Sequence, residues 1–510
     1  MGVNRRDFLR GTAWMGAAAV AAGCASKGMK LCSGGTMQGY AAPALKKVRV
    51  GFIGLGMRGP GAVHRIAKIP GVEVAALCDL YQERVDEQQA WLKENGKPPA
   101  REYVGPEAYK ALCESDLDAV YNVTSWDMHV PIALYAMEHG KHVFVEVPSA
   151  FTVEECWALV ETSERTRMHC MQLENCCYGE AEMLALNLCR QGLLGELVHG
   201  EGAYIHDLRD LCYADWAKKP TNEKYGYVSY WRLKHNVAHK GNQYDTHGLG
   251  PVCEYMNINR GDRFDYLVSL ESNQFNYEAY GRSVFKGHPW KENLKVAMGD
   301  MNTMLIKTVN GKSIMVQHDV SSPRPYSRIN RVTGTMGSFE GITFLDNYDY
   351  VDKNGKLVKA DPKDVLYSSG CFTRFGWGKK PGDGVHGYFG AKLAEEMRAK
   401  YKHPLWKKAG EFAKIVGGHG GMDFIMDLRW CYCLQNGLPL DTDVYDLASW
   451  CCLAELSEKS VRNRSSSVDV PDFTRGGWKT AKPLGIVDVD LVKMGFDPNL
   501  IKADSSALNV

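Results

Sequence analysis

The residues whose types and spacing most directly indicate chemistry are three glycines followed by one acid: Gly54, Gly56, Gly59 and Asp79. Glycines at this spacing let backbone amides approach a pyrophosphate at the N-terminus of a helix, where the helix dipole favours negative charge. An aspartate at the end of the following strand accepts hydrogen bonds from a ribose 2′-hydroxyl and repels a 2′-phosphate. The pattern therefore predicts a binding site for NAD rather than NADP.

The segments around these residues have the order that such a site requires. Runs of β-branched and apolar residues predict buried strands over 48–53, 72–77, 118–124 and 142–147. Helical patterns cover 59–69 and 131–139, and a capping box of Thr152 and Glu155 starts another helix. Residues 46–174 are therefore predicted to form a doubly wound Rossmann domain.

Ligands of such sheets bind beyond the carboxyl ends of the strands, which places the expected cofactor groove. Besides the glycines and Asp79, it should include residues from the glycine turn, from the segments after the fourth and fifth strands, and from the start of the next region. These are Met57, Arg58, Trp126, Asp127, Met128, His129, Glu146, Val147 and Asn175.

Beyond residue 180 the pattern changes to strands separated by loops. Strands are predicted over 199–206, 265–274, 301–309, 312–320 and 329–335, and two apolar-striped helices over 421–437 and 444–463. The expected fold class is α/β: an N-terminal Rossmann domain plus a larger α+β domain with an open, mainly antiparallel sheet. We expect the second domain to span 175–475 and a C-terminal tail to follow over 476–510.

The N-terminus has the pattern of an export signal. Arg5 and Arg6 precede Phe8 and a short alanine-rich apolar run, which resembles a twin-arginine signal; a general secretion signal is the alternative. The residues before Cys24 resemble a lipobox, so this cysteine is a candidate lipid anchor; cleavage near Ala41-Ala42 is the alternative. We expect residues 1–45 to be signal and tether, and the protein to act in the periplasm or at the cell surface.

Composition sets further limits. The chain has 510 residues, 45% hydrophobic and 24% charged, which suits a globular protein of two domains. A net charge of +1 offers no electrostatic basis for nucleic-acid binding. The 16 cysteines are scattered without metal-binding or disulfide spacing, so most should be buried free thiols. His235 and His239 have helical spacing, but no glutamate follows the first, so no metal is expected.

The segment Glu146-Val147-Pro148 carries the first resemblance to a known group. A Rossmann domain whose fifth strand ends in Glu-x-Pro resembles the glucose–fructose oxidoreductase and inositol dehydrogenase superfamily. Most members have a lysine between these two residues, near the reacting hydroxyl. Valine cannot move a proton, which counts against simple dehydrogenation with that lysine.

Longer motifs are similar to one branch, the NAD-dependent α-N-acetylgalactosaminidases of glycoside hydrolase family 109. They are "YWRLKHNVAHKGNQYDTHGLGPV", "NINRGDR" and "GGHGGMDFIMDLR", and the similarity covers nearly the whole chain. One departure is Asp245, where the branch commonly has proline. The resemblance implies a glycosidase that removes terminal α-linked N-acetylgalactosamine with retained configuration, using NAD without consuming it.

The resemblance also assigns roles to individual residues. His247 is expected to be the base for the sugar C3 hydroxyl, Tyr178 a base or acid at C2, and His419 a further candidate near the site. The expected substrate contacts are Tyr204, Arg232, Tyr244, Asp245, Thr246, His247 and Tyr326. Core packing for the tyrosines and a loop contact for His247 are the alternative interpretations.

The expected partners are a glycan with terminal α-N-acetylgalactosamine, no nucleic acid, a membrane only through a lipid at Cys24, and a second copy in a homodimer. Two other function classes stay open. One is an exported sugar dehydrogenase or oxidoreductase with tightly bound NAD. The other is a noncatalytic, NAD-bound sugar-binding lipoprotein, which would not need His247.

Overall fold

The computed structural model describes residues 35–214, 227–341, 350–351, 356–358, 371–374, 387 and 390–497. The predicted export signal and Cys24 lie outside these residues. From Thr36 onward the chain belongs to one compact unit. No helix in the part of the chain that the structure describes has the length and apolarity to cross a bilayer.

The N-terminal part of this unit is a six-stranded parallel sheet with the order β3-β2-β1-β4-β5-β6. Its strands are β1 (Val48–Ile53), β2 (Val72–Asp79), β3 (Arg101–Val104), β4 (Ala119–Asn122), β5 (His142–Val145) and β6 (Cys170–Gln172). The connecting helices are α2 (Gly59–Ile66), α3 (Gln82–Glu94), α4 (Ala108–Glu114), α5 (Trp126–Glu138) and α6 (Val153–Thr166). The predicted doubly wound domain is confirmed, as is the capping box of Thr152 and Glu155.

A second sheet of eight strands has the order β15-β12-β11-β7-β10-β9-β8-β16. These strands are β7 (Leu197–Ile205), β8 (Phe264–Glu271), β9 (Asn302–Thr308), β10 (Ser313–Asp319), β11 (Arg331–Gly334), β12 (Gly337–Glu340), β15 (Cys371–Arg374) and β16 (Val468–Asp469). Only β7 and β10 pair in parallel within it; the other neighbours are antiparallel. The predicted mainly antiparallel sheet is confirmed. A separate hairpin joins β13 (Tyr350–Val351) and β14 (Leu357–Val358).

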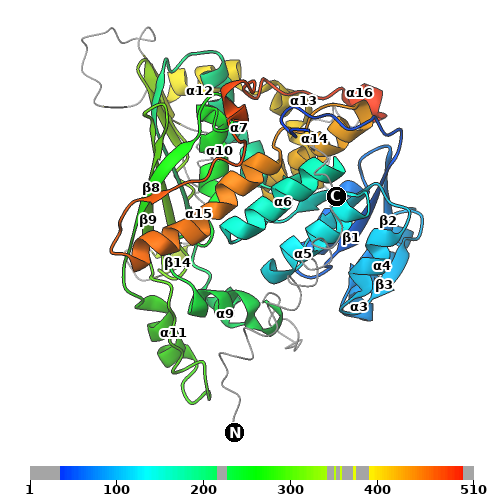
Figure 1. The fold of residues 1–510 in the computed structure, drawn as a ribbon, viewed down its shortest axis with the longest axis horizontal. Coiled ribbons are helices and arrows are strands. Elements are labelled where there is room, and N and C mark those ends of the chain that lie inside the picture. The colour runs from blue at the N-terminus through cyan, green and yellow to red at the C-terminus, as the bar shows by residue number, and fades with distance from the viewer. Residues whose placement is uncertain are drawn as a thin grey trace, which may run out of the picture. The chain divides into compact units, whose positions relative to one another are not determined.

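Helices complete the second part of the unit. They are α7 (Glu180–Arg190), α8 (Arg209–Tyr213), α9 (Trp231–Ala238), α10 (Thr246–Met256), α11 (Asn276–Val284), α12 (Ala391–Tyr401), α13 (Pro404–Val416), α14 (Met422–Asn436), α15 (Val444–Arg462) and α16 (Leu491–Met494). Short 3₁₀ turns are η1 (Asn175–Tyr178), η3 (Val228–Tyr230), η5 (His419–Gly421) and η6 (Gly477–Lys479). In Figure 1, α15 runs beside α6, and the two helices are in contact.

Two glycines bring α10 unusually close to β7. A Cβ atom on Gly202 would lie 2.0 Å from the carbonyl oxygen of Gly248, and one on Gly248 would lie 2.1 Å from the amide nitrogen of Ala203. Any side chain at either position would push the helix away from the sheet. This close approach fixes the first turn of α10, which carries His247.

The structure corrects the predicted extent of the tether. Residues 36–45 are packed rather than flexible, because Met37 and Ala42 are buried in the main core. The amide of Leu45 also donates to the carbonyl of Leu434 on α14, at 2.9 Å. The composition of this segment suggested a linker, but its few apolar side chains find long-range partners.

The C-terminal tail is also packed over its described part. Val489, Leu491 and Phe496 are buried in the same core, and the amide of Gly261 donates to the carbonyl of Trp478 at 2.7 Å. Thirteen cysteines between Cys78 and Cys452 are free thiols in the structure, and all of these except Cys189 are buried. Their burial follows the expected use of cysteine as a small apolar side chain.

Candidate functional site

The glycine turn after β1 has a shape that only glycine allows. Gly54 has a φ of +95°, and a Cβ atom there would lie 2.5 Å from the carbonyl oxygen of Val123. A Cβ atom on Gly59 would lie 2.2 Å from the carbonyl oxygen of Gly54. The turn is therefore tight enough to present the N-terminus of α2 to a pyrophosphate, and the residues present fit a dinucleotide.

Asp79 lies at the end of β2 and is buried beside the same turn. Its Oδ2 accepts the N–H of Leu55 at 2.7 Å, and its Oδ1 accepts the N–H of Tyr81 at 3.1 Å. The Nη1 of Arg84 lies 3.5 Å from Oδ1, and its guanidinium packs 4.8 Å from the centre of the Tyr81 ring. A carboxylate has further lone pairs, so Asp79 can still accept ribose hydroxyls. Sequence reasoning missed Arg84.

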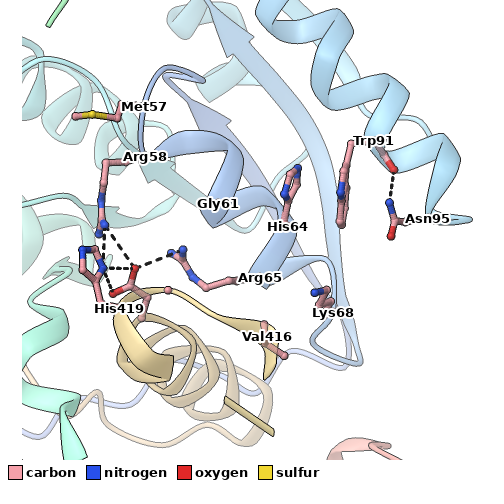
Figure 2. A pocket seen from close by; sticks show the side chains of 12 residues that line it. Met57, Arg58, Gly61, His64, Arg65, Lys68, Trp91, Asn95, Val416 and His419 are labelled. Carbon is pink, nitrogen blue, oxygen red and sulfur yellow. Dashed lines mark hydrogen bonds and ion pairs between the residues drawn. The ribbon is translucent and has the colours of Figure 1, made fainter. Parts of the chain in front are cut away.

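Arg58 connects the glycine turn to two other predicted residues, Glu146 and His419, and Figure 2 shows its contact with His419. Its Nη2 lies 3.2 Å from Oε1 of Glu146, and its Nη1 lies 3.2 Å from Nδ1 of His419. The same Nη1 lies 3.5 Å from Oδ2 of Asp423, which also accepts from Asn175 through Oδ1 at 2.5 Å. Three predicted residues, Arg58, His419 and Asn175, thus contact one carboxylate that was not predicted from the sequence, and Glu146 is linked to it through Arg58.

The charge of Asp423 depends on these neighbours. Burial opposes its ionisation, but Arg58, His419 and Arg65 outweigh that cost and hold the pKa of Asp423 well below its usual range. The carboxylate is therefore a fixed anion at the side of the cofactor groove. The only sequence signal for it was its position four residues after His419.

His419 is carried by an unusual loop. Gly417, Gly418, His419, Gly420 and Gly421 all have positive φ, at 93°, 86°, 46°, 71° and 101°. The backbone can adopt this run of positive φ angles because four of the five residues are glycine. The side chain of His419 is 51% exposed. The loop therefore presents one imidazole to solvent next to Arg58.

A crevice of about 390 Å³ lies between α2, the end of α3 and the loop before α14, and His419 is one of its lining residues (Figure 2). Polar and basic side chains line most of it, including His64, Arg65 and Lys68. Its lining contains neither His247 nor the tyrosines predicted to bind substrate. The crevice is therefore not the centre of the site.

That centre is a chain of hydrogen bonds through His247, on the first turn of α10. Its Nδ1 lies 2.6 Å from Oε1 of Glu174, and its Nε2 lies 3.3 Å from the hydroxyl of Tyr244. Glu174 is buried and also accepts the N–H of Cys176 at 3.0 Å. Burial opposes its ionisation, but the pKa of Glu174 is lowered because His247 and these hydrogen bonds favour the carboxylate.

Glu174 was not predicted from the sequence. It follows β6, 73 residues before His247, and no motif marks it. An ionised carboxylate can only accept hydrogen bonds, so the Nδ1 of His247 carries the proton of this contact. The lone pair of neutral His247 is then on Nε2, facing Tyr244.

An aromatic cage with one arginine adjoins His247. The guanidinium of Arg232 packs 4.9 Å from the ring centre of Trp126 and 4.7 Å from that of Tyr244, and its Nη1 donates to the hydroxyl of Tyr227 at 2.8 Å. Arg232 is only 5% exposed. Its Nε and Nη2 atoms are buried without a hydrogen-bond partner among the described residues. Unpaired buried donors are costly, so this arginine is suited to receive a polar ligand.

The cage contains most of the predicted substrate contacts. The rings of Tyr204 and Tyr244 are centred 4.6 Å apart, and Tyr326 stands edge-on to Tyr204 at 6.0 Å. Val147 is buried in the same apolar cluster as these rings. The superfamily's usual lysine position therefore faces aromatic side chains and carries no charge.

Tyr178 requires a correction, because the structure argues against the expected acid or base role. Its hydroxyl is buried and donates to Oδ2 of Asp441 at 3.1 Å, and Asp441 is paired with Arg429 at 2.7 Å. Burial, together with the charge of Asp441, raises the pKa of Tyr178 well above its usual value. This hydroxyl holds together the interior of the second domain instead of facing His247.

His129 also differs from its predicted place in the groove. Its Nδ1 lies 2.8 Å from the carbonyl oxygen of Pro148, and its Nε2 lies 3.1 Å from that of Thr124. Because burial lowers the pKa of His129, the neutral ring donates to one of these two carbonyls at a time, and it lies between the segments that follow β4 and β5. Asp127 on the same helix turn is exposed, and Met128 is partly buried. The ring of His129 supports the wall of the groove.

Asp245 and Thr246 begin α10 and are both buried. Asp245 occupies the N-cap position, yet its side chain makes no capping hydrogen bond, and its Oδ2 has no partner in the described part of the chain. Burial and the nearby charge of Glu174 raise the pKa of Asp245 well above its usual value. The protonated form of this acid is therefore favoured beside the His247 site.

Comparison with solved structures identifies the fold class. A levoglucosan dehydrogenase in complex with NADH matches with a TM-score of 0.55 at 18% identity, covering 84% of this chain and 100% of that one. A scyllo-inositol dehydrogenase from Lactobacillus casei, with bound NAD(H) and scyllo-inositol, matches with a TM-score of 0.54 at 14% identity, covering 83% and 99%. The family model for the oxidoreductase NAD-binding Rossmann fold matches residues 48–172. The chain is thus an NAD-binding protein with an oxidoreductase fold.

Its particular family is defined by the second domain. The family model "Glycosyl hydrolase 109, C-terminal domain" matches residues 178–364 and 388–480, and the chain belongs to this family. It is 47% identical to "Glycosyl hydrolase family 109 protein 1" of Bacteroides thetaiotaomicron, over 86% of each chain. It is 45% identical to a protein of Shewanella oneidensis named alpha-N-acetylgalactosaminidase, over 95% of this chain and 99% of the relative. The protein is an enzyme of the glycosidase class.

Proposed function

We propose that this enzyme removes terminal α-linked N-acetylgalactosamine from glycans by an NAD-dependent, redox-neutral mechanism with retained configuration. The observation that carries the proposal is the Glu174–His247–Tyr244 chain of hydrogen bonds, with contacts of 2.6 and 3.3 Å, beside a cage that contains unpaired arginine donors. The name of the Shewanella relative supports the substrate class.

The cage suits an N-acetylated sugar. Aromatic faces such as those of Tyr204 and Tyr244 pack against the apolar faces of sugar rings. The free Nε and Nη2 atoms of Arg232 are donors that match the carbonyl oxygen of an acetamido group or ring hydroxyls. A substrate that lacks these acceptors would leave both donors unpaired.

The two glutamates of the site do not favour ordinary glycoside hydrolysis. That route needs two carboxyl groups flanking the scissile bond, one as an acid and one as a base or nucleophile. Here Glu174 is buried against His247, and Glu146 is paired with Arg58 at 3.2 Å. Neither is free for such a role, which supports the NAD-dependent route.

The cofactor would be held by the glycine turn, Asp79 and the groove residues around Glu146. When bound, NAD would supply a reversible hydride acceptor for sugar C3, so that the cofactor would end each turnover in its starting state. The Nε2 atom of His247 accepts the proton of the C3 hydroxyl and returns it in the last step. Glu174 stays ionised and stabilises the imidazolium that forms, so positioning and charge are supplied by one contact.

The remaining steps need a second proton carrier. A C3 ketone acidifies the C2 hydrogen, so a base can remove that proton while the C1–O bond breaks, and the departing aglycone oxygen takes up the proton. Water then adds across the C1–C2 double bond, with its oxygen on C1 and its proton on C2. We assign these transfers to His419, since its imidazole is exposed and lies 3.2 Å from Arg58, which contacts Glu146. Val147 cannot take part, because it carries no titratable group.

The test is to incubate purified protein with an aryl α-N-acetylgalactosaminide and no added cofactor. Aryl release without net NADH accumulation supports the proposal, and His247→Ala should abolish most of it. NADH accumulating in step with product would instead indicate a sugar dehydrogenase. Sugar binding without turnover would indicate the noncatalytic alternative.

We also propose export by the twin-arginine pathway with NAD already bound, and lipid attachment at Cys24. The support is the sequence pattern alone, with Arg5 and Arg6 before the apolar run. Replacing both arginines by lysine should hold the protein in the cytoplasm in cell fractionation. Cys24→Ala should leave export intact but release the protein from the membrane fraction.

We also propose that the protein forms a homodimer through its open sheet. Apolar side chains on β8 and β9 face outward, with Leu270 68% and Leu305 49% exposed. Sedimentation analysis should give twice the chain mass, and Leu270→Lys with Leu305→Lys should give the monomer.

A further inference from the structure

Cys176 lies next to Glu174 and His247 and has no role in the proposed mechanism. Glu174, Cys176 and His247 each offer one ligand atom, and these three atoms lie within 4.8 Å of one another. Cys176 is fully buried. Carboxylate oxygen, thiolate sulfur and imidazole nitrogen together form the donor set that Zn²⁺ prefers in proteins.

The surroundings of the cluster are suited to a cation. Glu174 uses Oε1 for His247 and for the amide of Cys176, while its buried Oε2 has no hydrogen bond of good geometry among the described residues, although Thr246 interacts with this carboxylate. An ionised oxygen without a strong partner in the interior is an unused ligand.

The charges around the cluster can also be balanced. A dication bound by the Glu174 carboxylate and the Cys176 thiolate forms a neutral group. Arg328 donates to the sulfur of Cys176 at 3.3 Å, and its own charge is offset by Glu182 at 2.7 Å. Binding would therefore leave no uncompensated charge in the interior.

The distances allow a three-ligand site after small movements. Zn–S bonds of about 2.3 Å and Zn–N or Zn–O bonds of about 2.0–2.2 Å place tetrahedral donors about 3.3–3.6 Å apart. The Glu174–His247 contact of 2.6 Å would open, and the widest separation, at most 4.8 Å, would close by roughly an ångström. Water or a substrate oxygen would be the fourth ligand.

We propose that Glu174, Cys176 and His247 form an inhibitory binding site for a thiophilic divalent cation such as Zn²⁺. The thiol of Cys176 releases its proton to solvent as the sulfur–metal bond forms. Coordination through Nδ1 of His247 moves the imidazole proton to Nε2, so that no lone pair is left to accept the proton of a sugar hydroxyl. The metal thus stops turnover by fixing the wrong tautomer.

The inhibition rests on the proposed function of His247, whereas the binding of metal does not, so two measurements are needed. The first is activity of the holoenzyme against Zn²⁺ concentration, with reversal by a chelator. Cys176→Ser should weaken inhibition at least tenfold, given that even outer contacts of metal sites are worth about 10–100-fold. The matched control is Cys177→Ser, which changes an adjacent buried cysteine outside the cluster and should keep full sensitivity.

The second measurement uses Cd²⁺ and needs no activity. Wild-type holoenzyme and Cys177→Ser should show ultraviolet thiolate-to-cadmium absorbance that saturates at one ion per chain, and Cys176→Ser should lack it. If Cys176→Ser does not fold, Cys176→Ala takes its place. Cadmium absorbance without loss of activity would overturn the inhibitory role. Equal absorbance or equal inhibition in the Cys176 variant would overturn the site itself.

Discussion

The Nδ1 atom of His247 lies 2.6 Å from the Oε1 atom of Glu174, and this contact decides which ring nitrogen can act as a base. A carboxylate on one side of the imidazole holds the proton there and leaves the other nitrogen free. That nitrogen faces Tyr244 and the cage around Arg232. Tautomer, orientation and charge therefore all depend on a residue 73 positions earlier in the chain.

Glu174→Gln should reduce turnover by about 10²–10⁴, because the amide can hold the ring in either tautomer and no longer stabilises the imidazolium. Bound NAD and the unfolding temperature should change little. Glu182→Gln is the matched control, since it alters a buried glutamate that pairs with Arg328 and not with His247. Retention of more than about a tenth of wild-type activity by Glu174→Gln would contradict the assignment.

Tyr178→Phe should leave turnover within about twofold of wild type. It should lower the free energy of unfolding by about 0.5–1.5 kcal/mol, the usual net contribution of one hydrogen bond, because the hydroxyl is bonded to Asp441. Tyr244→Phe makes the same chemical change at His247 and should lower activity much more. Rate measurements and urea unfolding of both variants test the pair. Equal activity losses would restore a catalytic role to Tyr178.

Asp79 and Arg84 together should set the preference between NAD and NADP. Asp79→Ser removes the anion that repels a 2′-phosphate and frees Arg84, whose Nη1 now lies 3.5 Å from the carboxylate. We expect the Asp79→Ser variant to retain NAD more weakly and to bind NADP more strongly than the wild type. Calorimetry of cofactor-depleted protein measures both affinities. Adding Arg84→Ala should remove the gain in NADP affinity. NADP binding that is unaffected by Arg84 would exclude this role.

The local parts of the site could be predicted from the sequence, and the long-range parts could not. The turn from Gly54 to Gly59 is a short-range pattern whose backbone geometry follows from residue type. Glu174 has no such signal, because its partner His247 is 73 residues away. Asp423 has only its i,i+4 spacing from His419, while its other partner Asn175 is 248 residues away.

Tyr178 is a residue that the sequence predicted for the site but whose side-chain direction depends on a distant partner. Its place next to Asn175 suggested a catalytic hydroxyl, but the direction of the side chain is decided by Asp441, which is 263 residues away. The prediction that the tether extends to residue 45 was wrong for a similar reason. Composition alone could not show that Met37 finds a place in the core.

Asp245→Asn should stabilise the protein at neutral pH. Burial and Glu174 raise the pKa of Asp245 in the folded state, so between about pH 4, its ordinary value, and that raised value the unfolded chain holds fewer protons there. Stability of the wild type therefore falls with rising pH through this group. Asparagine is already neutral, so the gain should grow from pH 4 to pH 8, reach roughly 1–3 kcal/mol, and vanish in acid.

The comparison is a series of chemical unfolding curves for both proteins across this pH range. Asp441→Asn is a suitable control, because its carboxylate is paired with Arg429 and the change should destabilise. A gain that is independent of pH would mean that packing, and not the ionisation of Asp245, explains the effect.

The last prediction separates the proposed mechanism from ordinary glycoside hydrolysis, which breaks the C1–O bond without touching C2–H or C3–H. In the proposed mechanism the C2 proton is removed by His419, whose side chain is 51% exposed and therefore in contact with water. Product formed in D₂O should therefore carry deuterium at C2, as mass spectrometry and NMR can measure. Substrate deuterated at C3 should react more slowly if hydride transfer limits the rate, and should keep its label.

His419→Asn should slow aryl release and C2 exchange together while bound NAD stays constant. Product without C2 deuterium, or with inverted configuration, would rule the mechanism out.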